Sequence, residues 1–76
     1  MRVQSVMFRR SVFRTREQCK TWLVARGFRH YTSRATLNYW RWRQFPPEPG
    51  ATYRTMRAAR GVVFVLEISQ PARRRR

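Results

Sequence analysis

Residues 37–45 read Leu-Asn-Tyr-Trp-Arg-Trp-Arg-Gln-Phe, a stretch rich in aromatic side chains with a period-two alternation. Such alternation is typical of a β-strand, in which successive side chains point to opposite faces of the sheet. One face receives Trp40 and Trp42, which a small domain needs for its core. The alternate positions fall on the other face, namely Leu37, Tyr39, Arg41, Arg43 and Phe45. The stretch therefore predicts a sheet that is packed on one face and basic on the other.

The clearest helix signal lies before this strand. Thr15 is a favourable N-cap, and Gln18 three residues later completes a capping box, in which each side chain accepts a hydrogen bond from the other residue's backbone N–H. Gly27 stands where a left-handed residue commonly ends a helix. These signals predict a helix over about residues 15–26. Its apolar face has helical spacing: Cys19, Trp22 and Leu23.

Further strands are predicted on both sides of these two elements. Residues 3–8 read as a first strand and residues 28–32 as a short second one, followed by a polar turn over 33–36. After the proline-rich break, residues 53–57 and 62–68 read as a hairpin. The order β-α-(β)-β-β-β predicts an α+β fold, with one helix packed on an antiparallel sheet of about three to five strands.

We expect residues 2–69 to form a single small domain and residues 70–76 a basic C-terminal tail. The predicted core takes apolar side chains from the helix and the strands: Val3, Trp22, Leu23, Phe28, Trp40, Trp42, Phe64 and Leu66. The inward face of the last strand is left open, because Val63 and Val65 on its second face are apolar too.

Charge sets this chain apart from an ordinary domain of its size. Lysine and arginine together number 18 against three acids, which gives a formal net charge of +15 over 76 residues. Self-repulsion of this magnitude destabilises a compact state unless salt or an anionic partner screens it. All of the basic residues except Lys20 are arginines, whose planar guanidinium suits two-pronged contacts to phosphate or carboxylate. The composition therefore indicates a densely anionic partner.

Three groups of residues are the predicted contacts to that partner. The first is the face that carries Tyr39, Arg41 and Arg43, which reads either as a solvated surface or as a basic platform for nucleic acid. Arginines expected on adjacent strands extend it: Arg54 and Arg57. The second group is the cluster Arg9, Arg10, Arg14 and Arg16 around the strand-to-helix junction, in which Arg9 and Arg10 are the predicted contacts. The third is the polycationic tail, made of Arg73, Arg74, Arg75 and Arg76.

Catalysis is poorly supported by the residues present. One histidine, His30, and three separated glutamates provide no paired acid and base, and a Ser–His–Asp set lacks its aspartate. A single cysteine excludes an internal disulfide, and one cysteine with one histidine does not make a structural zinc site. The glycines are scattered and form no phosphate-binding loop. No cofactor, metal, small-molecule substrate or membrane span is expected, since the longest apolar run, 62–66, is far below the ~20 residues that cross a bilayer.

Several short motifs resemble a small α+β domain found in tailed phages and large DNA viruses. The matching segments are Val3-Gln4-Ser5-Val6, Trp22-Leu23 with Gly27-Phe28, residues 38–44, Tyr53-Arg54-Thr55, and Gly61-Val62 with Val65-Leu66. The resemblance spans about residues 3–68, and the chain departs from the pattern in its arginine content and its four terminal arginines. It implies a viral setting, as a virion component or a DNA-handling accessory, and it assigns no functional residue because that family has no established activity.

The leading expectation is a non-enzymatic basic module that binds nucleic acid, DNA above all, through its phosphates without reading sequence, packaged with a viral genome. The logarithm of its affinity should then fall steeply and linearly with the logarithm of salt concentration. The alternative is a minor capsid or cement protein whose arginines bind acidic surfaces of larger capsid subunits. A ribosome-associated basic protein is a third reading. The expected location is the virion or the infected host cell rather than the secreted space.

Overall fold

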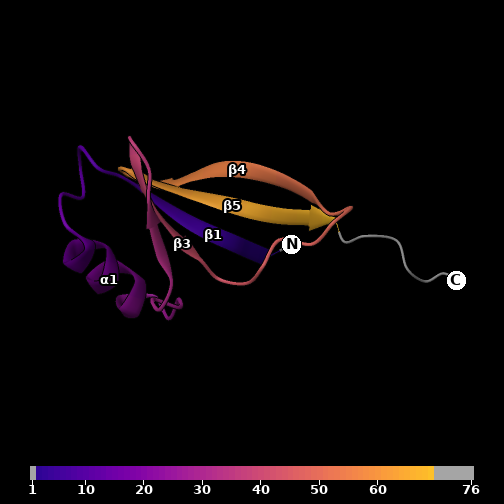
Figure 1. Ribbon diagram of the computed structural model, residues 1–76, viewed down its shortest axis with the longest axis horizontal. Helices are drawn as coiled ribbons and strands as arrows, with labels where there is room; N and C mark the ends of the chain where they lie inside the picture. Colours follow the sequence, from indigo (N-terminus) through magenta and orange to yellow (C-terminus); the bar gives the residue numbers. More distant parts are fainter. Residues whose placement is uncertain (1, 70–76) are drawn as a thin grey trace, which may run out of the picture.

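The computed structural model describes residues 2–69 of the chain (Figure 1), and the four-arginine tail lies outside the described residues. The elements in chain order are β1 (Arg2–Arg9), α1 (Arg16–Ala25), β2 (Ser33–Ala35), β3 (Tyr39–Arg43), β4 (Thr52–Ala59) and β5 (Val62–Ser69). All neighbouring strands pair antiparallel. The predicted fold class is confirmed: an α+β domain with one helix and, within the described residues, a sheet of five strands.

The strand order across the sheet is β2-β3-β1-β5-β4, so the first strand lies in the centre. Two hairpins flank it, β2–β3 on one side and β4–β5 on the other. The connection over residues 44–51, with three prolines, crosses from β3 to the far edge near the end of the sheet away from α1 (Figure 1). The expectation that β3 and β4 are adjacent is therefore wrong, because β1 and β5 lie between them.

The segment around residue 30 also differs from the prediction. β2 falls on Ser33–Ala35, where a turn was expected, and residues 28–32 form no strand. The Gln44 side chain satisfies the backbone of Arg29 in place of a neighbouring strand. Its Oε1 accepts from the Arg29 backbone N–H at 2.7 Å, and its Nε2 donates to the Arg29 carbonyl at 3.0 Å. The β2–β3 hairpin is closed by the Thr36 backbone N–H, which donates to the Tyr39 carbonyl at 2.8 Å.

Both predicted ends of the helix are confirmed. The Gln18 backbone N–H donates to Thr15 Oγ1 at 3.2 Å, and the Thr15 N–H donates to Gln18 Oε1 at 3.3 Å, which completes the capping box. At the other end, the Phe28 N–H donates to the Leu23 carbonyl at 2.9 Å and the Gly27 N–H to the next carbonyl at 3.2 Å. This is the Schellman pattern, and Gly27 adopts the left-handed φ of 77° that it requires.

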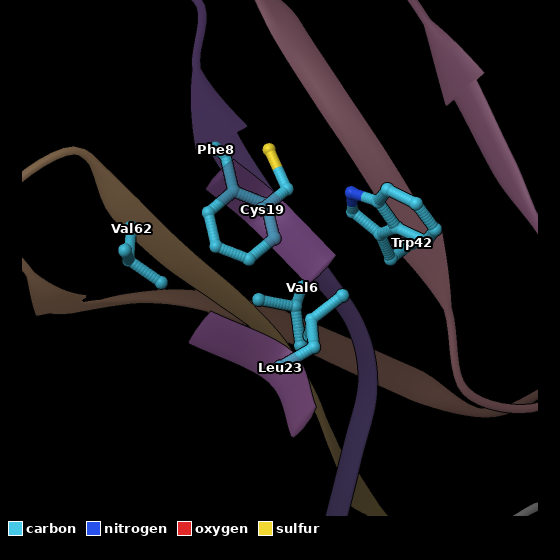
Figure 2. Packing of buried hydrophobic residues seen from close by; sticks show 6 residues of the cluster. All are labelled: Val6, Phe8, Cys19, Leu23, Trp42 and Val62. Carbon is cyan, nitrogen blue, oxygen red and sulfur yellow. The ribbon is translucent and has the colours of Figure 1, made fainter. Parts of the chain in front are cut away.

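The core lies between α1 and one face of the sheet (Figure 2), built from Val6, Phe8, Cys19, Leu23, Trp42 and Val62. Trp42 and Leu23 were predicted core residues, whereas Val6 and Phe8 were not. A bulge between Val3 and Ser5 in the pairing of β1 with β5 explains the difference. The extra residue lets Val3 and Val6 face the helix together, three positions apart, so simple alternation along β1 fails.

Cys19 is fully buried beside Trp42 (Figure 2). Burial raises the pKa of its thiol from 9.0 to about 11. The indole N–H of Trp42 opposes part of this rise in pKa. That N–H has no conventional hydrogen-bond acceptor among the described residues. The thiol is therefore held protonated and inert in the core.

This pKa predicts a loss of stability in alkaline solution. Below pH 9 the thiol is protonated in both states, whereas between pH 9 and 11 the unfolded chain releases the proton and the folded chain keeps it. The free energy of unfolding should fall over this window by roughly 3 kcal/mol, at about 1.4 kcal/mol per pKa unit. Denaturant titrations of the parent and of Cys19→Ala at each pH measure the effect, since tyrosine and lysine titrations are common to both proteins. Parallel pH curves for the two proteins would contradict it.

Candidate functional site

The sheet face opposite α1, which we call the open face, carries a row of side chains across all five strands. Directly paired residues of neighbouring strands share a face. The register pairs Arg34 with Arg41, Arg41 with Met7, Met7 with Val63, and Val63 with Arg57. The row therefore reads arginine, arginine, methionine, valine, arginine from the β2 edge to the β4 edge. On either side of it, Arg43 and Arg9 extend the same face.

These five arginines have no carboxylate partner among the described residues. Within residues 2–69, the ion pairs join Arg2 to Glu48 at 3.0 Å and to Glu67 at 2.8 Å, and Lys20 to Glu17 at 3.8 Å. Glu67 also belongs to the open face, but its side chain is almost fully buried at the end away from α1. The positive charge over the rest of the face is therefore not neutralised by the described part of the chain.

An apolar strip, which consists of Met7, Val63 and Val65, divides the arginines of the open face. All three side chains are only half-buried, and no other described element covers them. The strip lies on the central strand β1 and its neighbour β5, with Arg41 and Arg43 on one flank and Arg57 on the other. Strands are about 4.8 Å apart, so the flanking β3 and β4 stand roughly 14 Å from each other.

Arg41 differs from the other arginines of the face because it is anchored. Its Nε donates to Ser5 Oγ at 3.3 Å and its terminal nitrogen to Gln4 Oε1 at 3.4 Å. Ser5 and Gln4 are themselves buried, and the Gln4 amide donates to the Phe45 carbonyl at 2.7 Å. The bulge in β1 thus builds a polar support that fixes one guanidinium in place over the face.

Two hollows open at the basic flanks of this surface. One, of about 310 Å³, lies at the end of the sheet near the β4–β5 turn and has Arg9, Tyr39 and Arg57 in its lining. The guanidinium carbon of Arg9 stands 5.7 Å from the centre of the Tyr39 ring. The second, of about 460 Å³, lies beside the β2–β3 hairpin, and its basic lining consists of Arg34, Arg41 and Arg43.

The structure brings together five of the predicted contact residues and separates others. Tyr39, Arg41, Arg43, Arg9 and Arg57 share the open face. Two residues that the sequence grouped with them lie on the helix side. Arg54 pairs with Leu66, and the guanidinium of Arg10 lies over the Trp40 ring. Residues three apart on a strand face opposite ways, which is why Arg54 and Arg57 separate. The tail residues Arg73 to Arg76 lie outside the described part of the chain.

Arg34 belongs to the open face and was missed in the sequence. It lies on β2, in the segment predicted as a turn. The stretch Ser33-Arg34-Ala35 is only three residues long, and its strand character depends on pairing with β3. A local pattern could not reveal it.

The helix side of the molecule uses its arginines differently. The guanidinium carbons of Arg10 and Arg16 lie 4.7 and 5.1 Å from the centre of the Trp40 ring, and that of Arg26 lies 4.1 Å from the Trp22 ring. Such cation–π contacts are worth about 0.5–1 kcal/mol at exposed sites. These three arginines cover tryptophan surface at the rim of the core and lie away from the open face.

Comparison with protein-family models, with curated proteins and with solved structures finds no match for this chain. No relative therefore assigns a role to any residue of the open face. Across residues 2–69, the helix is too short and too polar to cross a lipid bilayer.

Proposed function

We propose that the open face binds nucleic acid through its phosphates, without sequence specificity and without catalysis. The observation that carries the proposal is the row of arginines and apolar side chains across all five strands, in which Arg34, Arg41 and Arg57 have no described carboxylate partner. A guanidinium without a partner can make paired, charge-assisted hydrogen bonds to a phosphate. Phosphate contacts of this kind are sequence-independent.

The charge of the folded part supports the same proposal. Residues 2–69 hold thirteen arginines and Lys20 against three glutamates, a net +11. Two of the glutamates are bound by Arg2 at one end of the sheet, so they do not reduce the positive potential over the centre of the open face. Binding a polyanion would relieve this self-repulsion and release the counterions that screen the phosphates.

The wider setting is part of the proposal. We place this module in a virus, packaged with the genome or acting beside it, as the resemblance to phage and viral domains implies. The terminal Arg73 to Arg76 would add four further charges to the electrostatic contact. Because backbone contacts dominate, single strands and duplexes of varied sequence should bind with little discrimination among base sequences.

A second candidate is a capsid or cement protein that binds acidic surfaces of larger subunits. The observation that favours it is a second set of arginines on the helix side, Arg10, Arg16 and Arg26, which lie away from the open face. Basic residues on both sides of the molecule suit a protein that bridges two acidic neighbours. Under this alternative, isolated nucleic acid would not be the partner of the open face.

Mapping of guanidinium signals by nuclear magnetic resonance tests the proposal. A strand of about 20 nucleotides, long enough for several phosphate contacts, is titrated into isotope-labelled full-length protein. We expect the Nε–H signals of Arg9, Arg43 and Arg57 to shift, because each is on the open face. Those of Arg26 and Arg54 serve as internal controls. Shifts confined to the helix side, or absent at low salt, would contradict the proposal.

A further inference from the structure

We infer that the nucleic acid bound by the open face is single-stranded, with unstacked bases lying on the apolar strip and in the hollow beside Tyr39. This inference rests on the proposed function and adds the strandedness of the partner and the location of its bases. It follows from the surface between the arginines, whose apolar character phosphate contacts alone do not explain.

The apolar strip is the first argument. Met7, Val63 and Val65 lie half-buried in the middle of the face, with arginines on both flanks. A duplex keeps its bases stacked inside and presents phosphates and sugars to a flat surface, so it would set charged groups against this strip. Burying charge against apolar surface without a partner is unfavourable. A single strand can turn its bases onto the strip while its phosphates reach the flanking arginines.

The hollow beside Tyr39 is the second argument. Its volume of about 310 Å³ is at the lower end of the ~300–1,000 Å³ range of small-molecule pockets, which suits one base. The half-buried Tyr39 and apolar residues including Val63 belong to its lining. Arg9 and Arg57 complete the lining, with the guanidinium carbon of Arg9 at 5.7 Å from the centre of the Tyr39 ring. The π-face of a base can stack on the Tyr39 ring or on one guanidinium, and the phosphate of the same nucleotide can bind the other arginine.

The turn that shapes this hollow is fixed by close packing. The Arg9 backbone N–H donates to the Gly61 carbonyl at 2.8 Å, which ties the end of β1 to the β4–β5 turn. Gly61 has φ of 74°, and a Cβ added there would stand 2.7 Å from Cβ of Val12. The hollow is thus part of the folded framework and does not depend on a mobile loop to form.

Binding measurements with three probes test the inference on the full chain. The probes are an oligothymidine of about 20 nucleotides, a duplex of the same length, and an abasic strand of the same length that keeps the phosphates and lacks the bases. We expect the oligothymidine to bind at least about 10-fold more tightly than the abasic strand at equal salt, because base stacking contributes substantially per base. We also expect it to bind more tightly than the duplex.

Two variants of Tyr39 locate the base. Tyr39→Leu keeps an apolar side chain but loses the ring, and it should weaken oligothymidine binding by between about 5- and 100-fold and weaken duplex binding much less. Tyr39→Phe keeps the ring and should bind like the parent. Thermal unfolding of both variants checks that the domain remains folded, and the abasic strand tests base contact in the unaltered protein.

The possible outcomes separate the inference from the proposed function. Salt-dependent binding that is equal for the oligothymidine, the abasic strand and the duplex would overturn the inference and leave phosphate binding intact. The same holds if Tyr39→Leu weakens strand and duplex binding equally. Failure of all three probes to bind at low salt would overturn the proposed function itself.

Discussion

Replacing Arg34, Arg43 and Arg57 together by glutamine should weaken binding of a single strand by between about 10- and 100-fold at physiological salt. The three arginines are exposed, lie on the open face and have no described carboxylate partner. Each exposed charge contact contributes up to about 1 kcal/mol, and about 1.4 kcal/mol is a tenfold change in affinity. Glutamine keeps a polar side chain on the strand surface, so the fold should persist. Fluorescence anisotropy measures the affinity.

A matched variant on the helix side separates location from total charge. Arg16, Arg26 and Arg54 are also exposed, with Arg16 over the Trp40 ring, and their replacement by glutamine removes the same three charges. Arg26 rests on the Trp22 ring and Arg54 pairs with Leu66 on the helix side of the sheet. This variant should lose less than about threefold in affinity, through weaker long-range attraction alone. Equal losses in the two triple variants would show that the open face is not the contact surface.

Trp42→Ala should cost about 3–5 kcal/mol of stability, the largest single-residue effect we expect. Trp42 is 1% exposed and lies in the core beside Val6, Cys19 and Leu23 (Figure 2). A chain of this length has roughly 4–11 kcal/mol of total stability, at 0.05–0.15 kcal/mol per residue. The variant should therefore be partly or largely unfolded at room temperature. Urea titration followed by circular dichroism measures the loss.

Leu37→Ala provides the matched control for this substitution. Leu37 is also a large apolar residue near β3, but its side chain is 88% exposed in the loop of the β2–β3 hairpin. Its replacement should change stability by less than about 0.5 kcal/mol. If Trp42→Ala were as mild as Leu37→Ala, the packing of β3 against α1 would be different from that described.

Local signals in the sequence predicted the helix and the faces of β3 correctly. Thr15, Gln18 and Gly27 act within a few residues of one another, so their capping contacts can be inferred from spacing alone. The alternation of Trp42 with Arg43 likewise follows from the strand period, and the structure confirms a buried tryptophan and an exposed arginine. In both cases the determining interaction is between near neighbours in the chain.

Long-range pairing could not be predicted in the same way. The central position of β1 and the separation of β3 from β4 depend on contacts between residues far apart, such as Met7 with Arg41 and Val63. The bulge at Gln4 shifts the buried positions of β1, and its polar support for Arg41 forms only when three segments meet. The composition of the open face is therefore a property of the sheet order rather than of any one strand.

The arginines illustrate this limit most clearly. The sequence grouped Arg54 with Arg57 and left Arg34 out. The fold separates the first two by the strand period, and it adds Arg34 through the pairing of β2 with β3. The number of basic residues in the sequence predicts an anionic partner. Only the strand order shows which arginines share one face and can contact the same partner.

The salt dependence of binding for the parent and the open-face triple variant tests the central claim most directly. For single strands, the logarithm of affinity falls with the logarithm of salt with a slope of about −0.7 per neutralised phosphate. Loss of Arg34, Arg43 and Arg57 should therefore make the slope shallower by roughly 2. The helix-side triple variant should keep the slope of the parent. Binding that ignores salt, or slopes that are the same for the parent and the open-face variant, would contradict phosphate binding by this face.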